Sequence, residues 1–266
     1  AGAARTNVSF LLIPTTTQVV AVTGRMTAPQ PVSTIEATIS DRLTHMLPLF
    51  GRDFLAVTSL APGVVGNPNA PSTNGQLSWS NNVIVDGASH YSKWRSAART
   101  FYSGYPLEAI QDVQVLTSQF APEYGEALSS VTTARTRSGG NVPHGSVLVF
   151  GQSGALNDQP VFAARRPPAS SIRVGATYGG PIAEDRTFVF GSYEGRRARS
   201  ANIVASPVAP QAEVRNDEDE HLALVKLDHR QGSNDLVSFR YNGQWFTWVN
   251  ENGGLWLPGS GQKYRN

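Results

Sequence analysis

The sequence contains no cysteine. Disulfide bridges and thiolate metal sites are therefore excluded, and the redox compartment stays undecided. Lysine is nearly absent too, because the basic residues are arginines apart from Lys93, Lys226 and Lys263. No basic block is dense enough to indicate nucleic-acid binding, so no nucleic-acid partner is expected. Charged residues make up 16% of the chain, against about 25% in a typical soluble domain.

Motifs for catalysis and nucleotide binding are also missing. No G-x-S-x-G elbow, P-loop or G-x-G-x-x-G fingerprint occurs in the sequence. The histidines are scattered, and His221 and His229, which share one face of a predicted strand, lie about 26 Å apart along it, too far to share a metal ion. We therefore expect no enzyme, no cofactor and no metal site.

No stretch approaches the ~20 consecutive apolar residues of a membrane-spanning helix. The second half of the chain instead alternates apolar and polar residues, a pattern typical of β-strands with two unlike faces. The alternating segments are 144–152, 171–180, 186–197, 221–230 and 236–248.

These five segments of about ten residues have the length and alternation of transmembrane β-barrel strands, with an apolar face toward lipid and a polar face toward the lumen. Aromatic residues at 188–193 and 245–248 are candidates for the membrane interface. The acidic run 217–220 is expected in a loop, as solvated charge. A soluble antiparallel sheet with one wet face would show the same alternation, so the pattern alone leaves both structures open.

The first half mixes short predicted strands with short predicted helices, which indicates an α+β unit. Helices are expected at 41–47, where Ser40 and Asp41 are good caps, and at 51–60 and 106–110. The dipeptide Asp86-Gly87 ends a clean strand and predicts a tight turn, which the Asp86 side chain is expected to fix. Long polar loops are expected at 63–81 and 88–105.

Three segments of the chain resemble one family. The run IQDVQVLTSQFAPEYGEALSSVTTARTRSG (110–139) resembles the closing segment of the plug domain in TonB-dependent outer-membrane transporters of the Oar-like branch. LPLFGRDFLAVTSLAPGVV (47–65) is similar to the plug pattern of that branch, and GGPIAEDRTFVFGSYEG (179–195) to one of its early barrel turns. The chain departs from the pattern at Ser129-Ser130, where the family commonly has two glycines.

The resemblance implies a domain order. Residues 1–14 would end a carboxypeptidase-regulatory-like β-sandwich domain, 15–31 would form a linker, 32–143 the plug, and 144–266 the first five strands of an antiparallel transmembrane β-barrel. Such a chain is mostly β, and its barrel is incomplete, because about 22 strands are needed to close around a plug. The expected location is the cell outer membrane, in contact with its lipid, with the plug and N-terminus facing the periplasm.

The linker holds an apolar, β-prone run between prolines with no obvious partner strand. Such a strand invites addition to another sheet, and in position it is similar to the TonB box, through which the family pairs with TonB. The alternative is an ordinary strand of the preceding domain or of the plug. The candidate box residues are Gln18, Val19, Val20, Ala21, Val22 and Thr23.

The loop 88–105 concentrates aromatic and arginine side chains, which are typical anchors of recognition surfaces; packing against the barrel wall is the equal alternative. By resemblance, the apex residues that contact substrate are Tyr91, Trp94, Arg95, Arg99, Tyr102 and Tyr124. The residues expected to shape the plug are Pro48, Gly51, Arg52, Asp86, Gly87 and Gly125. Arg52 is expected to hydrogen-bond loop carbonyls.

The sequence thus predicts an outer-membrane receptor or transporter whose uptake is energised through TonB. Its substrate could be a small molecule such as a metal chelate, a glycan or a peptide, or a protein. A secreted or surface β-rich adhesion or carbohydrate-binding module without a transport role stays open as the alternative.

Overall fold

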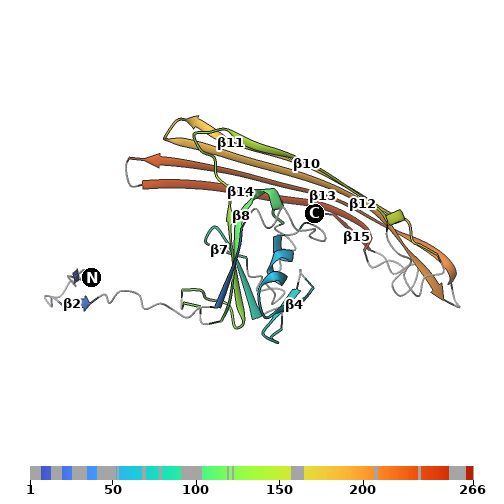
Figure 1. Cartoon of the computed structure of the whole chain (residues 1–266), viewed down its shortest axis with the longest axis horizontal. Coiled ribbons are helices and arrows are strands. Elements are labelled where there is room, and N and C mark those ends of the chain that lie inside the picture. Colours follow the sequence, from blue (N-terminus) through green and yellow to red (C-terminus); the bar gives the residue numbers. More distant parts are fainter. Residues whose placement is uncertain are drawn as a thin grey trace.

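The computed structural model contains a large curved sheet with a small unit on one face, and a separate N-terminal hairpin (Figure 1). Its description covers residues 7–12, 20–25, 35–40, 52, 54–67, 70–77, 80–90, 104–118, 120–121, 123–156, 165–206, 209–232, 235–251 and 262–265.

The large sheet is a meander in which every strand pairs antiparallel with the next, in the order β10-β11-β12-β13-β14-β15. Its strands are β10 (His144–Ser153), β11 (Ala169–Ala183), β12 (Thr187–Ser206), β13 (Ala209–Gln231), β14 (Asp235–Glu251) and β15 (Gln262–Arg265). The first five coincide with the five predicted segments, and the short β15 is an addition. Tight turns join β11 to β12 and β13 to β14, where Asp185 and Gly232 adopt positive φ.

Two strands are much longer than predicted. β12 has 20 residues and β13 has 23, whereas about 9–11 suffice to cross a membrane. The acidic run 217–220 consequently lies within β13, where the sequence analysis expected a loop. The reason is charge pairing, since β12 places Arg196, Arg197 and Arg199 opposite these acids.

The small unit is built on a five-stranded sheet in the order β3-β8-β9-β6-β7. β6 and β9 run parallel, and the other neighbours are antiparallel. The strands are β3 (Ile35–Ser40), β6 (Asn81–Val85), β7 (Ala88–Ser89), β8 (Ile110–Ser118) and β9 (Ser130–Thr136). A second hairpin, β4 (Val64–Asn67) with β5 (Ala70–Thr73), lies beside this sheet.

Short 3-10 helices replace two of the predicted helices. η2 (Phe54–Leu60) corresponds to the segment 51–60, and η5 (Leu107–Ala109) follows Pro106 as predicted. A third such turn, η6 (Gly154–Leu156), follows β10. The predicted helix 41–47 lies outside the described residues. No helix in the described ranges is long and apolar enough to cross a membrane.

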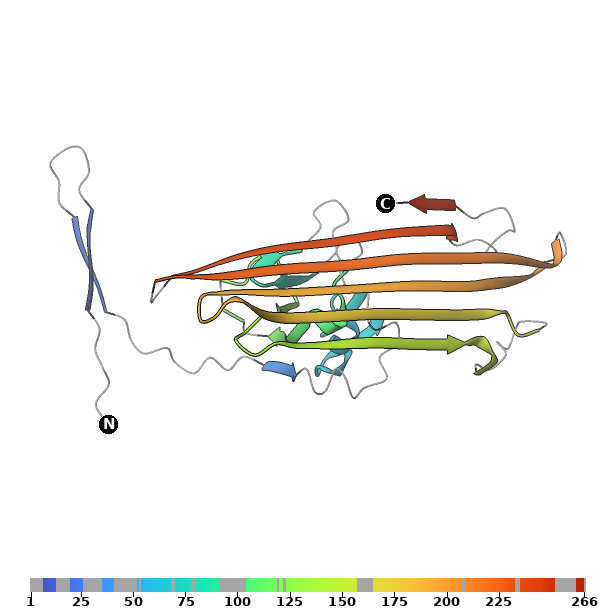
Figure 2. The same ribbon diagram turned by 90° about the horizontal axis from the view of Figure 1, so that it is seen from above.

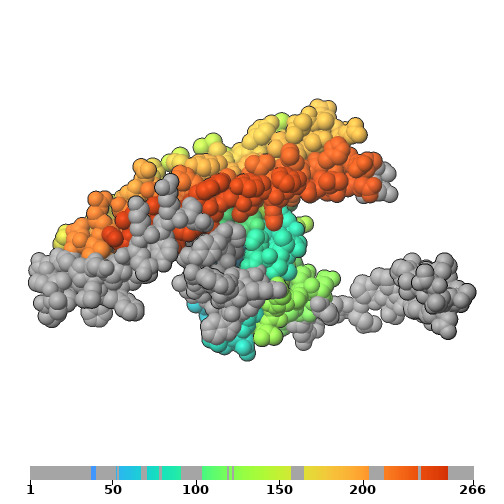
Figure 3. Space-filling view, turned by 180° about the vertical axis from the view of Figure 1, so that it is seen from behind, coloured from blue at the N-terminus to red at the C-terminus, as the bar shows by residue number. Residues whose placement is uncertain are grey.

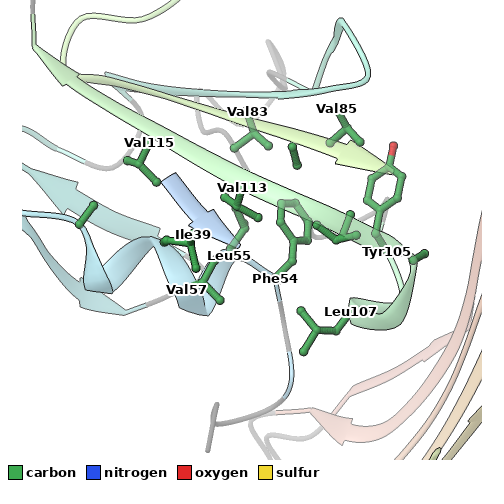
Figure 4. Close-up of a cluster of buried hydrophobic side chains, with 14 of the residues drawn as sticks. Ile39, Phe54, Leu55, Val57, Val83, Val85, Tyr105, Leu107, Val113 and Val115 are labelled. Atoms are coloured by element: carbon green, nitrogen blue, oxygen red, sulfur yellow. The ribbon is translucent and has the colours of Figure 1, made fainter. Parts of the chain in front are cut away.

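One apolar cluster holds the small unit together (Figure 4). Phe54 and Val57 of η2 are fully buried against Val113 and Val115 of β8 and Val85 of β6. Burying each such side chain contributes about 1.5–3 kcal/mol. The cluster also includes Phe190 and Leu224 of the large sheet, so the core of the small unit continues into the interface.

The N-terminal hairpin consists of β1 (Asn7–Leu12) and β2 (Val20–Arg25), paired antiparallel. Val20, Ala21, Val22 and Thr23 of the candidate box pair with β1, although the sequence shows no obvious partner strand. Gln18 and Val19 lie outside the described residues. The predicted boundary at residues 14 and 15 falls between two paired strands. Figure 2 shows this hairpin beyond the end of the large sheet at which β10 begins.

Candidate functional site: a polar sheet face covered by the small unit

The two faces of the large sheet differ in chemistry. On β14, Val237, Phe239, Tyr241 and Trp245 point away from the small unit and are exposed. The neighbouring strands continue this outward face, because paired residues in an antiparallel sheet share a face. Its exposed apolar members on those strands are Val147, Val149, Ile172, Val174, Tyr178, Tyr193, Val225 and Leu227.

On β12 the apolar band gives way to charged residues toward the end of the strand away from the short turns. Tyr193, whose hydroxyl lies 2.7 Å from Nδ1 of His221, is its last aromatic on β12. After Gly195, the outward positions of β12 carry charge, and Arg197 donates to Asp219 at 3.0 Å. From Val237 to Trp245 the band extends about 26 Å along β14, close to the ~25 Å height of the apolar band in membrane barrels. Phe188 and Phe190, predicted as interfacial aromatics, instead point inward and are buried.

Polar side chains make up most of the inward face, and the small unit covers part of this face (Figure 3). Arg173 of β11 and Glu194 of β12 form a buried ion pair there. A buried pair of this kind is costly to desolvate, so it constrains geometry more than it adds stability. Asp228 is buried on the same face and accepts a 2.6 Å hydrogen bond from the Ser238 hydroxyl.

Asp86 connects the small unit to this face. Its carboxylate accepts hydrogen bonds from the Thr136 backbone N–H at 2.8 Å and the Thr136 hydroxyl at 2.5 Å. Nη1 of Arg240 on β14 donates to the same carboxylate at 2.7 Å and to the Val85 carbonyl at 3.1 Å. The turn itself rests on backbone conformation, because Asp86 and Gly87 both have positive φ. The side chain therefore joins β9 and β14 instead of fixing its own turn.

Arg240 also lies against an aromatic pair. Its guanidinium carbon is 5.6 Å from the ring centroid of Tyr105, whose hydroxyl lies 2.8 Å from Nε2 of His90. Burial, with a further contribution from the Arg240 charge, lowers the pKa of His90. Burial raises the pKa of Tyr105. Burial would raise the pKa of Asp86, but the hydrogen bonds from Thr136, the charge of Lys226 and the hydrogen bond from Arg240 outweigh it, and the pKa is lowered.

A second connection lies farther along β14. The Gly104 N–H donates to Oε1 of Gln244 at 3.0 Å, and Asn242 donates to the Gly104 carbonyl at 3.3 Å. A side chain at Gly104 would meet the Leu222 methyl at 2.9 Å, so glycine lets the backbone approach the wall. Gln244 in turn donates to Glu220 at 2.8 Å.

Arg52 forms an ion pair that the sequence did not predict. It pairs with Glu108 at 2.5 Å, and both side chains are mostly buried. Its φ of 51° is uncommon for a residue other than glycine. Pro48 and Gly51 lie outside the described residues.

The candidate substrate residues are mostly untested. Tyr91, Trp94, Arg95, Arg99 and Tyr102 lie outside the described part of the chain. Tyr124 is half-buried, and the neighbouring Gly125 carbonyl accepts a 3.0 Å hydrogen bond from Asn82. The structure therefore ties this turn to the start of β6.

Ser129 and Ser130, which replace the glycines of the family pattern, both donate hydroxyl hydrogen bonds to Oδ1 of Asn81. The Ser130 hydroxyl also lies 3.1 Å from that of Thr73. These buried hydroxyl and amide groups therefore have hydrogen-bond partners, as buried polar groups in proteins generally do.

Sequence reasoning missed the wall residues that bond to the small unit, Arg240, Asn242 and Gln244. It also missed the buried ion pair between Arg173 and Glu194 on the inward face. Their signal was their place on the polar side of the predicted strands, but alternation does not indicate which polar residues face a partner. Within the described residues, no three histidine, aspartate or glutamate side chains gather as metal ligands.

Parts of the chain are similar to known outer-membrane proteins. The outer membrane beta barrel domain model matches residues 135–218. The TonB-dependent transporter Oar of Myxococcus xanthus is 32% identical over 150 residues, which cover 53% of this chain and 14% of that protein. The chain is a homologue of a TonB-dependent transporter. Its location is therefore the outer membrane.

Solved structures show the same fold. The outer membrane transporter YddB of Escherichia coli matches with a TM-score of 0.63 and 13% identity over 84% of this chain and 35% of that one. The siderophore receptor PirA of Acinetobacter baumannii matches with a TM-score of 0.58 and 18% identity over 86% of this chain and 34% of that one. The chain thus spans about a third of the length of these structures. These relatives are transporters and receptors rather than enzymes.

Proposed function

We propose that the chain supplies the plug and the first wall strands of an outer-membrane receptor that takes up its substrate with energy from TonB. The observation that carries the proposal is the pair of unlike faces on one sheet. An exposed apolar band would face lipid, and the polar opposite face is covered by the small unit, as expected of a plug in a lumen.

The proposed domain order follows the predicted one. Residues 32–143 form the plug and 144–266 the wall, with the N-terminus on the periplasmic side. Residues 15–31 carry the box, and residues 1–14 close a preceding β domain. The five long strands and the short sixth strand form an open sheet. An uptake path would require a closed wall, because unpaired strand edges are not tolerated in lipid.

TonB would bind by strand addition at residues 18–23. β2 belongs to a two-stranded sheet with β1, and a strand in such a sheet offers a second edge for a partner. Pairing there would transmit force through the linker to the plug. Substrate would contact Tyr91, Trp94, Arg95, Arg99, Tyr102 and Tyr124 at the plug apex.

Deleting residues 18–23 from the full-length protein tests this function. Uptake should be lost and capture by the C-terminal domain of TonB abolished, while insertion into the outer membrane persists. Deleting the six linker residues 26–31 is the matched control, which shortens the chain equally without touching the box. Unchanged TonB capture after the first deletion would refute the box assignment.

A further inference from the structure

A cavity of about 420 Å³ opens on the large sheet beyond the small unit. It is lined by β12 from Arg196 onward and by β14 at Trp248. Arg196 on β12 and Trp248 on β14 follow Glu194 and Gln244 along their strands and lie on the same inward face. Gln244 accepts a hydrogen bond from Gly104 of the small unit. The cavity therefore lies on the side away from the short turns, where substrate would arrive first. A volume of this size is ordinary for a small-ligand site.

The charges at the cavity are already paired. Arg196 donates to Glu218 at 2.5 Å, and Arg199 lies 3.1 Å from Asp219 and 3.8 Å from Asp217. Two arginines and the two lining acids, Asp217 and Glu218, leave no net charge on the lining. An anionic chelate would have to compete with these carboxylates for the arginines. The lining thus suits a ligand without net charge.

The remaining lining combines one large aromatic with small polar groups. Trp248 has a tilted ring contact with Phe246 at 4.9 Å between centroids, which restrains its orientation. Around it lie the amides of Gln152 and Asn216 and the hydroxyls of Ser171 and Ser200. A pyranose ring has an apolar C–H face that stacks on indole and a rim of hydroxyls that need both donors and acceptors.

We propose that this cavity is a subsite for a neutral oligosaccharide, with Trp248 as the stacking platform. The inference rests on the proposed function, because it names the substrate class of that receptor. A peptide fits less well, because the lining offers only small apolar groups, Ala169, Ala198 and Val249, besides the tryptophan.

The test is calorimetric titration of the detergent-purified full-length protein with maltohexaose, cellohexaose and laminarihexaose. At least one should bind, and Trp248→Ala should weaken that binding tenfold or more, while Trp248→Phe retains most of it. Trp245→Ala is the matched control, since Trp245 is on the same strand but points outward. Asn216→Ala keeps the Trp248 platform and should weaken sugar binding by a smaller factor. It keeps the proposal testable if Trp248→Ala does not fold.

Failure of all three sugars to bind would overturn the proposal. So would sugar binding that Trp248→Ala leaves unchanged, or Trp248-dependent binding of ferric enterobactin or hexa-alanine offered in the same assay. None of these outcomes affects TonB capture or membrane insertion, so failure of the subsite is distinguishable from failure of the receptor function.

Discussion

The Asp86 carboxylate lies 2.7 Å from Nη1 of Arg240, although the two residues are 154 positions apart in the chain. The same carboxylate accepts two hydrogen bonds from Thr136. One side chain therefore joins the central strand of the small unit to the wall, and a change there affects both the fold of the small unit and its attachment.

Asp86→Asn should weaken this attachment. The substitution removes the negative charge and leaves the part-buried Arg240 without its carboxylate. The free energy of unfolding should fall by about 1–3 kcal/mol. Amide hydrogen exchange in β6 and β9 of the full-length protein should quicken accordingly. Asp235→Asn, at an exposed position on β14, is the control and should change nothing; equal protection in both variants would contradict the role of Asp86.

Acid should loosen the small unit through His90. Its pKa is lowered from the ordinary value of 6.5, so the folded state favours the neutral ring. The contribution of His90 to stability is complete above pH 6.5 and declines as the pH falls through the lower folded value. The protection factors of amides near Tyr105, which correct for the slower intrinsic exchange at lower pH, should therefore fall between pH 7.5 and 5.5.

His90→Gln keeps a polar group beside the Tyr105 hydroxyl but does not titrate, so it should remove most of that pH dependence. His144→Gln, at an exposed site on β10, should leave it in place. A pH response that survives in the His90 variant would assign the effect to other groups.

Gly139 should not tolerate a side chain. A Cβ there would lie 2.3 Å from the Val189 carbonyl oxygen and 2.8 Å from that of Gly180, both backbone atoms of the large sheet. Gly139→Ala should lower the free energy of unfolding by about 1–3 kcal/mol, because the backbone at residue 139 must move away from the large sheet. The measurement is the urea midpoint of the full-length protein, which should fall. Gly140→Ala is the control, since nothing lies within 4 Å of its Cβ position. Equal urea midpoints for the two variants would show that the backbone at Gly139 lies farther from Gly180 and Val189 than the structure indicates.

The apolar band should reject charge. Tyr241→Lys places an ammonium group at the middle of the outward face, which should make the free energy of folding into lipid less favourable by about 2–4 kcal/mol. The folded fraction of the full-length protein, seen as heat-modifiable migration in gels, should fall. Thr247→Lys lies on the same face beyond Trp245 and should assemble normally. If both variants assembled equally, the band would not face lipid.

Much of the large sheet follows from sequence. Alternation within 236–248 assigned Phe239 and Tyr241 to one face and Arg240 and Asn242 to the other, because side chains in a strand must alternate. The length of β12 and β13 was not predictable in this way. The acids at 217–220 look like a solvated loop until the register sets them opposite arginines of β12.

The sequence by itself determined the alternating strands, the tight turn at Asp86-Gly87 and the family resemblance, because these depend on local conformation and on order along the chain. Only the tertiary structure decided that Asp86 reaches Arg240, that Arg52 pairs with Glu108, that Phe190 is buried while Tyr193 is exposed, and that β1 supplies a partner for β2. Those facts depend on which faces meet across long chain separations, and a one-dimensional pattern does not contain that information.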